Sequence, residues 1–534
     1  MSVISYIDGV FYGGSNFPIP SHMNFGRLMV DKLLENKNKV ALISGDTGEK
    51  ISYVDLAKKI VNVATALSKL GVRQGDVVAI CSENRIEFYV AIIAVYYIGA
   101  VATFLNMAYT KDEVIHTVKI SKPTFAFLSP STQKLHYDTL KNHTTITKFI
   151  VFGDSATKEI SFDKLTLDDP NGNVMPADFY GRAQTALILY SSGTTGLPKG
   201  AKITHLNLIA TTFQTLSLPD NSRPVLTIAP WCNTMGIMTL NGFLRSGKTV
   251  VFLKRFDENL FLQVIEKYKV GEVLIAPPVL ILLSKSPNVS KYDLSSVYMI
   301  HSGGAPLDSD VIALVKARLP NLRNVTQGYG MTESTGSIAT ELDAAPKQGS
   351  VGFVTEGIVV KIVDVETRAI LGPNKRGEIC LNGLVLFDGY IGKERGDDFD
   401  EEGFFKTGDI GYYDEDGFFF IVDRIKELIK YKAWQVSPAE LEAVVLLHDA
   451  VKDVGVIGTP DSEAGELPTA FVVKKPGSNV TEKDILDFVG TKVSPWKRLR
   501  GGVKFIEEIP KTGSGKILRR KLRELLPKNV KSKL

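Results

Sequence analysis

Hydrophobic positions in the first 350 residues or so form short runs rich in valine and isoleucine, and these alternate with amphipathic stretches. Such runs are typical of buried strands, and the intervening 3.6-residue pattern is typical of helices. The alternation predicts an α/β architecture with largely parallel, buried sheets. The predicted strands are 41–45, 77–81, 124–128, 149–153, 186–190, 225–229, 249–253, 272–276 and 297–301, and the clearest helices are 259–268 and 309–319.

The hydrophobic pattern changes after about residue 350. Predicted strands at 359–364, 377–382 and 411–414 follow one another with little helix between them. Asp-Glu-Asp-Gly at 414–417 indicates the turn of a hairpin. These features predict a small antiparallel or barrel-like unit.

A third pattern begins after Asp423 and Arg424. Ser437 followed by Pro438 is typical of a helix start, with serine as the N-cap and proline at the first helical position. A chain of 534 residues exceeds one typical domain, so at least two packed units are expected. We expect a large N-terminal domain over 1–423 and a small α+β C-terminal domain over 424–534.

The uncharged stretch 88–110 is long enough to raise the question of a membrane span. Tyrosine, glycine and threonine residues interrupt it, and it is predicted to be a buried helix followed by a strand. No membrane span is therefore expected.

Composition narrows the class of protein further. Hydrophobic residues make up 44% and charged residues 23%, which is typical of a globular protein, and a net charge of +4 gives no indication of nucleic-acid binding. Cys81, Cys232 and Cys380 lie far apart, so we expect a reducing compartment and no structural zinc.

Targeting signals at either end of the chain would indicate its location in the cell. The first residues show no secretory signal. The chain finishes Ser532-Lys533-Leu534, which is the C-terminal address read by the peroxisomal import receptor. We therefore expect a peroxisomal location.

The strongest local motif is Tyr-Ser-Ser-Gly-Thr-Thr-Gly-Leu-Pro-Lys-Gly at 190–200. Glycine-freed backbone N–H groups, hydroxyls and a cation suit a polyphosphate, whereas a plain surface turn is the alternative. It is not a Walker A loop, because Lys199 is followed by Gly200. The pattern at 510–517 also fails that motif, since Pro510 and Ile517 stand at defining positions.

Three weaker motifs follow. In Gln-Gly-Tyr-Gly-Met-Thr-Glu at 327–333, the ring could stack on a base and Glu333 could bind Mg²⁺ beside Thr332, although a strand-to-turn junction is equally consistent. Asp409 could accept hydrogen bonds from ribose hydroxyls, although a turn aspartate is the commoner case. Residues 510–516 could present a lysine on a loop or form a turn before a solvated basic helix. Nucleic-acid contact by that helix is disfavoured, because no aromatic platform accompanies it.

Two histidines, His205 and His301, stand near these motifs, and lone histidines are more often structural than catalytic. No Ser/His/Asp order or nucleophile elbow supports a hydrolase.

Five motifs together occur in the order seen in the adenylate-forming superfamily, which includes acyl-CoA synthetases, 4-coumarate–CoA ligases and beetle luciferases. They are YSSGTTGLPKG, QGYGMTE, KTGD, VDRIKELIKYKAWQVSPAELE and PKTGSGK. The resemblance covers nearly the whole chain and is strongest to insect luciferase-like acyl-CoA synthetases. It implies an N-terminal adenylation domain and a mobile C-terminal domain hinged near 423–426.

The resemblance also implies a role for individual residues. Those that would hold the ATP phosphates are Ser191, Ser192, Gly193, Thr194, Thr195 and Lys199. Gly304, Ala305 and Pro306 would line the adenine and acyl pocket, with Gly328 and Tyr329 against adenine. Asp409 and Arg424 would hold the ribose, Glu333 would bind Mg²⁺, and Thr332 would contact the phosphate or the acyl-adenylate. Lys516 would act in adenylation, and Lys430 after the C-terminal domain rotates.

The acyl side departs from the luciferases. The pocket would include Asn233, Met235, His301, Gly303 and Ser337. Luciferases typically carry paired histidines where Cys232 and Asn233 stand, and their luciferin-side arginine falls at Thr211. The resemblance therefore favours an ATP-dependent acid–CoA ligase acting on fatty or aromatic acids. A luciferase and a catalytically silent binding homologue are the alternatives.

Overall fold

The structure is a computed structural model, and it describes residues 4–14, 22–153, 159–169, 172–179, 181, 184–191, 198–214, 223–305, 307, 309–343, 346–432, 434–461, 463–511 and 515–526. The chain forms two compact units. The first comprises Met1–Gly304, Asp310–Val360 and Leu381–Phe405, and the second comprises Ala305–Ser309, Lys361–Cys380 and Lys406–Leu534. The predicted domain boundary between residues 423 and 424 is the point at which the C-terminal domain is expected to rotate, and this boundary stays a prediction.

A seven-stranded sheet lies in the first unit, in the order β11-β10-β6-β5-β7-β8-β9. All neighbouring strands are parallel except β10 and β11, which form an antiparallel hairpin. The strands are β5 (Val77–Cys81), β6 (Val101–Phe104), β7 (Phe125–Leu128), β8 (Lys148–Val151), β9 (Ile160–Ser161), β10 (Thr185–Ser191) and β11 (Lys199–Thr204).

A nine-stranded sheet follows the order β18-β17-β16-β15-β14-β12-β13-β3-β4. Its central strands from β16 to β3 are parallel, and β4, β17 and β18 add antiparallel edges. The strands are β3 (Val40–Ser44), β4 (Lys50–Ser52), β12 (Val225–Thr227), β13 (Val250–Phe252), β14 (Glu272–Ile275), β15 (Met299–Gly303), β16 (Asn324–Gly330), β17 (Ser337–Thr340) and β18 (Phe353–Val354).

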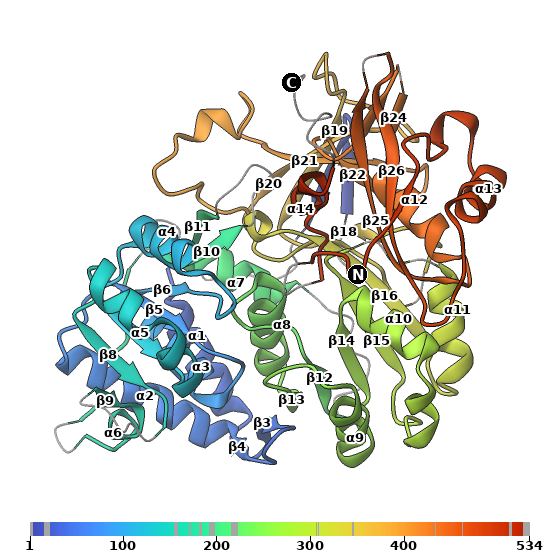
Figure 1. Cartoon of the computed structure of the whole chain (residues 1–534). Coiled ribbons are helices and arrows are strands. Elements are labelled where there is room, and N and C mark those ends of the chain that lie inside the picture. Colours follow the sequence, from blue (N-terminus) through green and yellow to red (C-terminus); the bar gives the residue numbers. More distant parts are fainter. Residues whose placement is uncertain are drawn as a thin grey trace. The chain divides into compact units, whose positions relative to one another are not determined.

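Helices connect the parallel strands of these sheets, as parallel pairing requires (Figure 1). They are α1 (Phe25–Glu35), α2 (Tyr53–Lys69), α3 (Ile86–Tyr97), α4 (Lys111–Ser121), α5 (Pro130–His143), α6 (Phe162–Leu165), α7 (His205–Phe213), α8 (Thr234–Arg245), α9 (Glu258–Tyr268), α10 (Pro277–Lys285) and α11 (Ser309–Arg318). The mixed α/β prediction is thereby confirmed.

The long apolar stretch forms α3 and then β6, as predicted. Every residue of α3 except Glu87 is buried, and the helix packs against α1 and α2. Among the described residues, no helix combines the length and the apolar character that crossing a membrane needs.

A third sheet has the order β1-β2-β19-β20-β21-β22. Its strands are β1 (Ile4–Ile7), β2 (Val10–Gly13), β19 (Ile358–Val363), β20 (Gly377–Gly383), β21 (Phe405–Tyr413) and β22 (Phe419–Arg424). The predicted hairpin is confirmed, because β21 and β22 pair antiparallel on either side of residues 414–418. Gly417 adopts φ +84° in that turn, a conformation that glycine accepts without strain.

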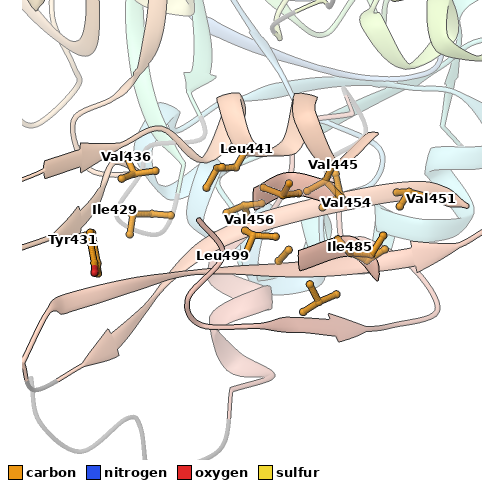
Figure 2. Packing of buried hydrophobic residues seen from close by; sticks show 14 of the residues in the cluster. Ile429, Tyr431, Val436, Leu441, Val445, Val451, Val454, Val456, Ile485 and Leu499 are labelled. Atoms are coloured by element: carbon orange, nitrogen blue, oxygen red, sulfur yellow. The ribbon is translucent and has the colours of Figure 1, made fainter. Parts of the chain in front are cut away.

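The last part of the chain forms a five-stranded sheet in the order β24-β23-β26-β25, with β27 paired to β26. Its elements are β23 (Ile429–Tyr431), β24 (Trp434–Val436), α12 (Pro438–Leu446), β25 (Val451–Asp461), β26 (Gly465–Lys474), α13 (Glu482–Lys492), β27 (Val503–Phe505) and α14 (Arg519–Glu524). Figure 2 shows its core, in which Leu441 and Val445 of α12 face Val454 and Val456 of β25. Ser437 caps α12 and accepts the Glu440 N–H, as the sequence predicts.

Most predicted strand ends differ from the observed ones by one or two residues, but β21, predicted at 411–414, begins six residues earlier, at Phe405. The whole of β15 is shifted by two residues, since it is predicted at 297–301 but formed by Met299–Gly303. The N–H of Val297 bonds to the carbonyl of Leu294 in a turn, which delays the start of the strand. Its C-terminal end continues because Gly303 pairs with Gly328 of β16.

Candidate functional site

The predicted phosphate-binding motif sits at the end of the β10–β11 hairpin. Ser191, the last residue of β10, is the register partner of Lys199, the first residue of β11. The two residues therefore face each other across the hairpin where the motif leaves the sheet. Ser192, Gly193, Thr194 and Thr195 lie outside the described residues.

Glu333 is a buried carboxylate in a short 3-10 helix, Thr332–Ser334. The hydroxyl of Tyr390 donates to Glu333 Oε1 at 2.5 Å. The backbone N–H of Phe387 donates to the carbonyl oxygen of Glu333 at 2.9 Å. These bonds fix Glu333 by both its side chain and its backbone.

Tyr390 contacts three residues that were predicted for the site, namely Ser191, Lys199 and Glu333. Its ring lies 5.0 Å from the Lys199 ammonium, and its backbone bridges to Ala201 of β11. Burial and the Glu333 carboxylate raise the pKa of Tyr390, and the Ser191 hydroxyl opposes the rise. Sequence reasoning missed Tyr390, because it stands alone in the chain about 190 residues from the motif it supports and carries no local pattern.

A second connection joins Thr332 to the start of α8. The Thr234 hydroxyl donates to the Thr332 hydroxyl at 3.2 Å. Asn233 is the N-cap residue of that helix, and its side chain makes no capping hydrogen bond. The chain thus brings two predicted pocket residues, Asn233 and Met235, to the element that contacts Thr332.

The carboxyl ends of β15 and β16 carry the predicted adenine-side residues. Gly303 is the register partner of Gly328, while Tyr329 pairs with Ala339 of β17 and Gly330 with Ser337. A Cβ on Gly303 would lie 3.0 Å from the carbonyl oxygen of Gly328 and 4.0 Å from the sulfur of Met235. Gly303, Gly328 and Met235 therefore share one face of this sheet end.

Glycines at this sheet end also permit close approach of the backbone. Gly304 follows directly with φ +87°, in the left-handed region. A Cβ on Gly330 would lie 2.5 Å from the carbonyl oxygen of Gly336. Ala305 follows Gly304 in sequence but belongs to the second unit, and Pro306 lies outside the described residues.

His301 is anchored in a buried polar cluster. Its Nδ1 lies 2.8 Å from the Thr326 hydroxyl, and its Nε2 lies 3.3 Å from Glu272 Oε2. Glu272 also accepts from Lys248 and from the hydroxyl of Tyr298, both at 2.7 Å. Burial opposes ionisation of Glu272, but the bonds from His301, Lys248 and Tyr298 hold its pKa below the usual range.

This cluster uses both ring nitrogens of His301, which supports the structural interpretation of that histidine. Its role in a substrate pocket stays a prediction. His205 is structural as well: it is fully buried in α7, and its Nδ1 accepts the backbone N–H of Phe25 at 3.1 Å.

The predicted ribose-binding pair is present in the second unit. Asp409 and Arg424 are register partners in the β21–β22 hairpin, and Arg424 Nε lies 3.1 Å from Asp409 Oδ1. The Thr407 hydroxyl accepts the N–H of Asp409 at 3.0 Å and donates to the carbonyl of Ile379 at 2.7 Å. Asp409 is only 4% exposed, so its carboxylate is largely shielded from water, and the role of the Asp409–Arg424 pair in holding ribose stays a prediction.

The two predicted lysines also belong to the second unit. Lys430 is exposed on β23, where its N–H donates to Glu466 Oε2 at 2.8 Å. Lys516 is exposed just before α14. The peroxisomal address at 532–534 lies outside the described residues, and the location stays a prediction.

Comparison with known proteins identifies the family. A family model for AMP-binding enzymes matches residues 31–391, and a model for the AMP-binding enzyme C-terminal domain matches residues 440–516. A luciferin 4-monooxygenase of Nipponoluciola cruciata is 41% identical over 507 residues, covering 92% of each chain. A 4-coumarate–CoA ligase 1 of Petroselinum crispum is 38% identical, covering 95% of this chain and 94% of the ligase.

Among solved structures, the luciferase-like enzyme from the nonluminescent Zophobas morio mealworm aligns with a TM-score of 0.73 at 30% identity. The alignment covers 79% of this chain and 100% of that one. Such similarity, over most of the chain and through two matching family models, leaves no ambiguity about membership. This chain belongs to the AMP-binding enzymes of the adenylate-forming superfamily, the family that also contains luciferin 4-monooxygenases and 4-coumarate–CoA ligases.

Proposed function

We propose that this chain is an ATP-dependent carboxylic acid–CoA ligase that forms an acyl-adenylate and then an acyl-CoA thioester. The observation that carries the proposal is the gathering of Ser191, Lys199 and Glu333 around Tyr390 at the end of the β10–β11 hairpin. The buried Asp409–Arg424 pair supports it from the second unit. A binding homologue without catalysis would have no need to keep these charged groups together with Lys516.

In the first half-reaction, a carboxylate oxygen of the acid attacks the α-phosphorus of ATP. The new bond is the acyl–phosphate bond of the adenylate, and the bond to the bridging oxygen breaks to release pyrophosphate. Two anions approach each other, so cationic side chains must offset charge as it shifts to the leaving group. Lys199 stands at the phosphate motif for this role, and Lys516 would be supplied by the C-terminal part of the chain.

In the second half-reaction, the coenzyme A sulfur attacks the carbonyl carbon of the adenylate. AMP leaves with the electron pair of the broken acyl–phosphate bond, and the thiol loses its proton. Lys516 must withdraw before the thiol can approach, and Lys430 lies on the segment proposed to replace it. A single domain rotation would supply both arrangements.

Mg²⁺ fits the donors at Glu333, because a buried carboxylate beside the Thr332 hydroxyl offers the oxygen ligands that this ion prefers. When bound, Mg²⁺ would neutralise phosphate charge and so assist departure of pyrophosphate. Tyr390 orients the carboxylate by holding one of its oxygens.

A luciferase is the second candidate, favoured by the 41% identity to a luciferin 4-monooxygenase. The ligase is preferred because the arginine and the paired histidines that luciferases place on the luciferin side are replaced at three positions. Thr211 stands where the luciferase arginine falls, and a Cβ on Gly336 would lie only 2.7 Å from its Cγ2. Cys232 and Asn233 replace the paired histidines.

The proposed acid has an apolar chain or ring. Met235 follows Asn233 by two residues, Met331 directly precedes Thr332, and Leu280 is fully buried in α10. Apolar linings with few polar groups are typical of sites for fatty or aromatic acids.

The test is release of pyrophosphate by purified protein supplied with ATP, Mg²⁺ and a panel of acids from acetate to stearate, cinnamates and D-luciferin. We expect release that depends on the acid, formation of acyl-CoA when coenzyme A is added, and loss of both in Lys516→Ala. Strong light with D-luciferin, without acyl-CoA from any acid, would make luciferase the function instead.

A further inference from the structure

The segment 510–518, here called the lysine segment, is closed at its base by backbone contacts. Lys511 and Ile517 form an antiparallel bridge, and the N–H of Leu518 donates to the carbonyl of Pro510 at 2.8 Å. The ammonium of Lys511 also lies 2.6 Å from Asp453 Oδ2 on β25. Residues 512–514 lie outside the described residues, and all of these contacts belong to the two ends of the segment.

An apolar anchor holds these ends against the C-terminal sheet. Ile517 packs against the cluster formed by Ile457, Phe471, Val473, Ile509, Leu522 and Leu526. Gly455 allows this approach, because a Cβ there would lie 2.7 Å from Leu522 and 3.4 Å from Ile517.

A polar anchor follows immediately in Arg519. Its Nε donates to the carbonyl of Val456 at 3.1 Å, and its Nη1 donates to Glu427 Oε2 at 3.0 Å. Its Nη2 donates to both carboxylate oxygens of Glu442, at 2.8 and 2.9 Å. The side chain is only 11% exposed, so these bonds replace water almost completely.

The Arg519 contacts join three elements to the lysine segment. Val456 lies on β25, Glu442 on α12, and Glu427 in the turn that follows the Asp409–Arg424 pair. The N–H of Glu427 donates to the carbonyl of Arg424 at 2.9 Å. The lysine segment and the chain just after the predicted hinge are thus connected through one guanidinium.

A lysine could not satisfy this arrangement. The guanidinium is planar and donates in several fixed directions, whereas an ammonium is a single point of charge. Burial raises the pKa of Glu442 to about 7, and Arg519 opposes that rise. Removing the guanidinium would leave the buried Glu442 carboxylate without its counter-charge and near the partly exposed carboxylate of Glu427.

We propose that Arg519 is a positioning residue for the adenylation step, because it holds the segment that presents Lys516. The proposal rests on the proposed function, in which Lys516 acts in adenylation. Arg519 also makes Lys516 move together with Glu427, so rotation at the hinge withdraws the lysine as part of one rigid body. Arg519 itself touches neither substrate nor the reacting atoms.

The test measures the two half-reactions separately in the full-length protein. Adenylation is followed by acid-dependent exchange of pyrophosphate into ATP without coenzyme A, and thioester formation by adding coenzyme A to a synthetic acyl-adenylate. The variants are Arg519→Met, Arg519→Lys, Lys516→Ala and the double variant of Arg519→Met with Lys516→Ala. Arg520→Met is the matched control, because that neighbouring side chain is 77% exposed.

We expect Arg519→Met to lower kcat for adenylation about 10- to 100-fold, as misplacement of a reacting group by about 1 Å does. The KM for ATP and the rate of thioester formation should change by less than about threefold, because neither depends on the position of Lys516. The kcat of Arg519→Lys for adenylation should lie between those of Arg519→Met and the wild type, and the kcat of Arg520→Met should match the wild type. In the Lys516→Ala background, Arg519→Met should cause almost no further loss.

Multiplicative losses in the double variant, or an equal fall in both half-reactions, would overturn the positioning role. If Arg519→Met does not fold, Glu427→Gln weakens one bond of the guanidinium and should lower adenylation selectively, by about tenfold. An equal effect of Glu427→Gln on both half-reactions would also count against the proposal. If the wild type shows no pyrophosphate exchange with any acid, the proposed function itself is refuted. This result is obtained before any variant is made, so it cannot be confused with a failure of the positioning role.

Discussion

Glu333 and Tyr390 form a hydrogen-bonded pair in which a buried carboxylate depends on one hydroxyl for its orientation. A buried polar group that loses its partner keeps its full desolvation cost. If Glu333 holds Mg²⁺ as proposed, the position of its carboxylate should matter more for the metal than for folding.

Tyr390→Phe should therefore raise the Mg²⁺ concentration needed for half-maximal adenylation by about 10- to 100-fold, the typical cost of losing a hydrogen bond that orients a metal-binding carboxylate. A Mg²⁺ titration of pyrophosphate exchange measures this. Tyr137→Phe is the matched control, since Tyr137 donates to Glu159 in a second tyrosine–glutamate pair outside the candidate site. An unchanged Mg²⁺ requirement in Tyr390→Phe would contradict the role of the pair.

His205 provides a prediction about pH. Burial lowers the pKa of His205 to about 3, from an ordinary value of 6.5. Between those values the unfolded chain binds the proton and the folded chain does not, so stability is complete above about pH 6.5 and falls as the pH drops. Through this residue alone, the free energy of unfolding falls by at most about 1.4 kcal/mol for each pH unit.

His205→Gln should make the urea midpoint of the first unit less dependent on pH between about 5 and 6.5. Glutamine can still accept the N–H of Phe25 but has no proton to gain. The variant should also be less stable above about pH 6.5, because the imidazole packs against Tyr96 and Phe179. If the urea midpoints of the wild type and of His205→Gln depend equally on pH, the buried neutral state of His205 is contradicted.

At the scale of elements, the parts with strong local patterns could be predicted from the sequence. The buried strand β5 and the hairpin turn at 414–417 were predicted because a run of valine and isoleucine or an Asp-Gly turn determines them locally. The end of β15 was not, because Gly303 continues the strand only through its partner Gly328, which is 25 residues away.

The cap of α12 tests how local signals act in the C-terminal unit. The Ser437 hydroxyl accepts the N–H of Glu440 at 3.3 Å and donates to Asp423 Oδ2 at 2.5 Å. Ser437→Ala should destabilise the first turn of α12 by about 1 kcal/mol. Faster hydrogen exchange of the first-turn amides would show it.

Ser494 offers a matched comparison for this cap. It also precedes a proline in the same unit, but its side chain makes no capping hydrogen bond. Ser494→Ala should therefore leave exchange nearly unchanged. Equal effects of the two substitutions would show that the Ser437 bonds contribute little.

At the scale of the whole molecule, motif order predicted which residues matter but not how they are held. Ser191, Lys199 and Glu333 could be found because each lies in a recognisable motif. Tyr390 and Arg519 could not, since their roles arise from contacts with residues distant in sequence, such as Glu333 and Glu427. Supporting contacts of this kind depend on the folded chain and have no signature of their own.

The central claim is that one polypeptide carries an acid through an adenylate to a thioester. A single-turnover experiment tests it most directly: excess enzyme is mixed with α-labelled ATP, Mg²⁺ and the best acid of the panel, and coenzyme A is added afterwards. The proposed function predicts that labelled acyl-AMP accumulates first and is then converted to AMP and acyl-CoA in equal amounts. Acyl-AMP that persists after coenzyme A is added, or that is consumed by oxygen with emission of light, would contradict it.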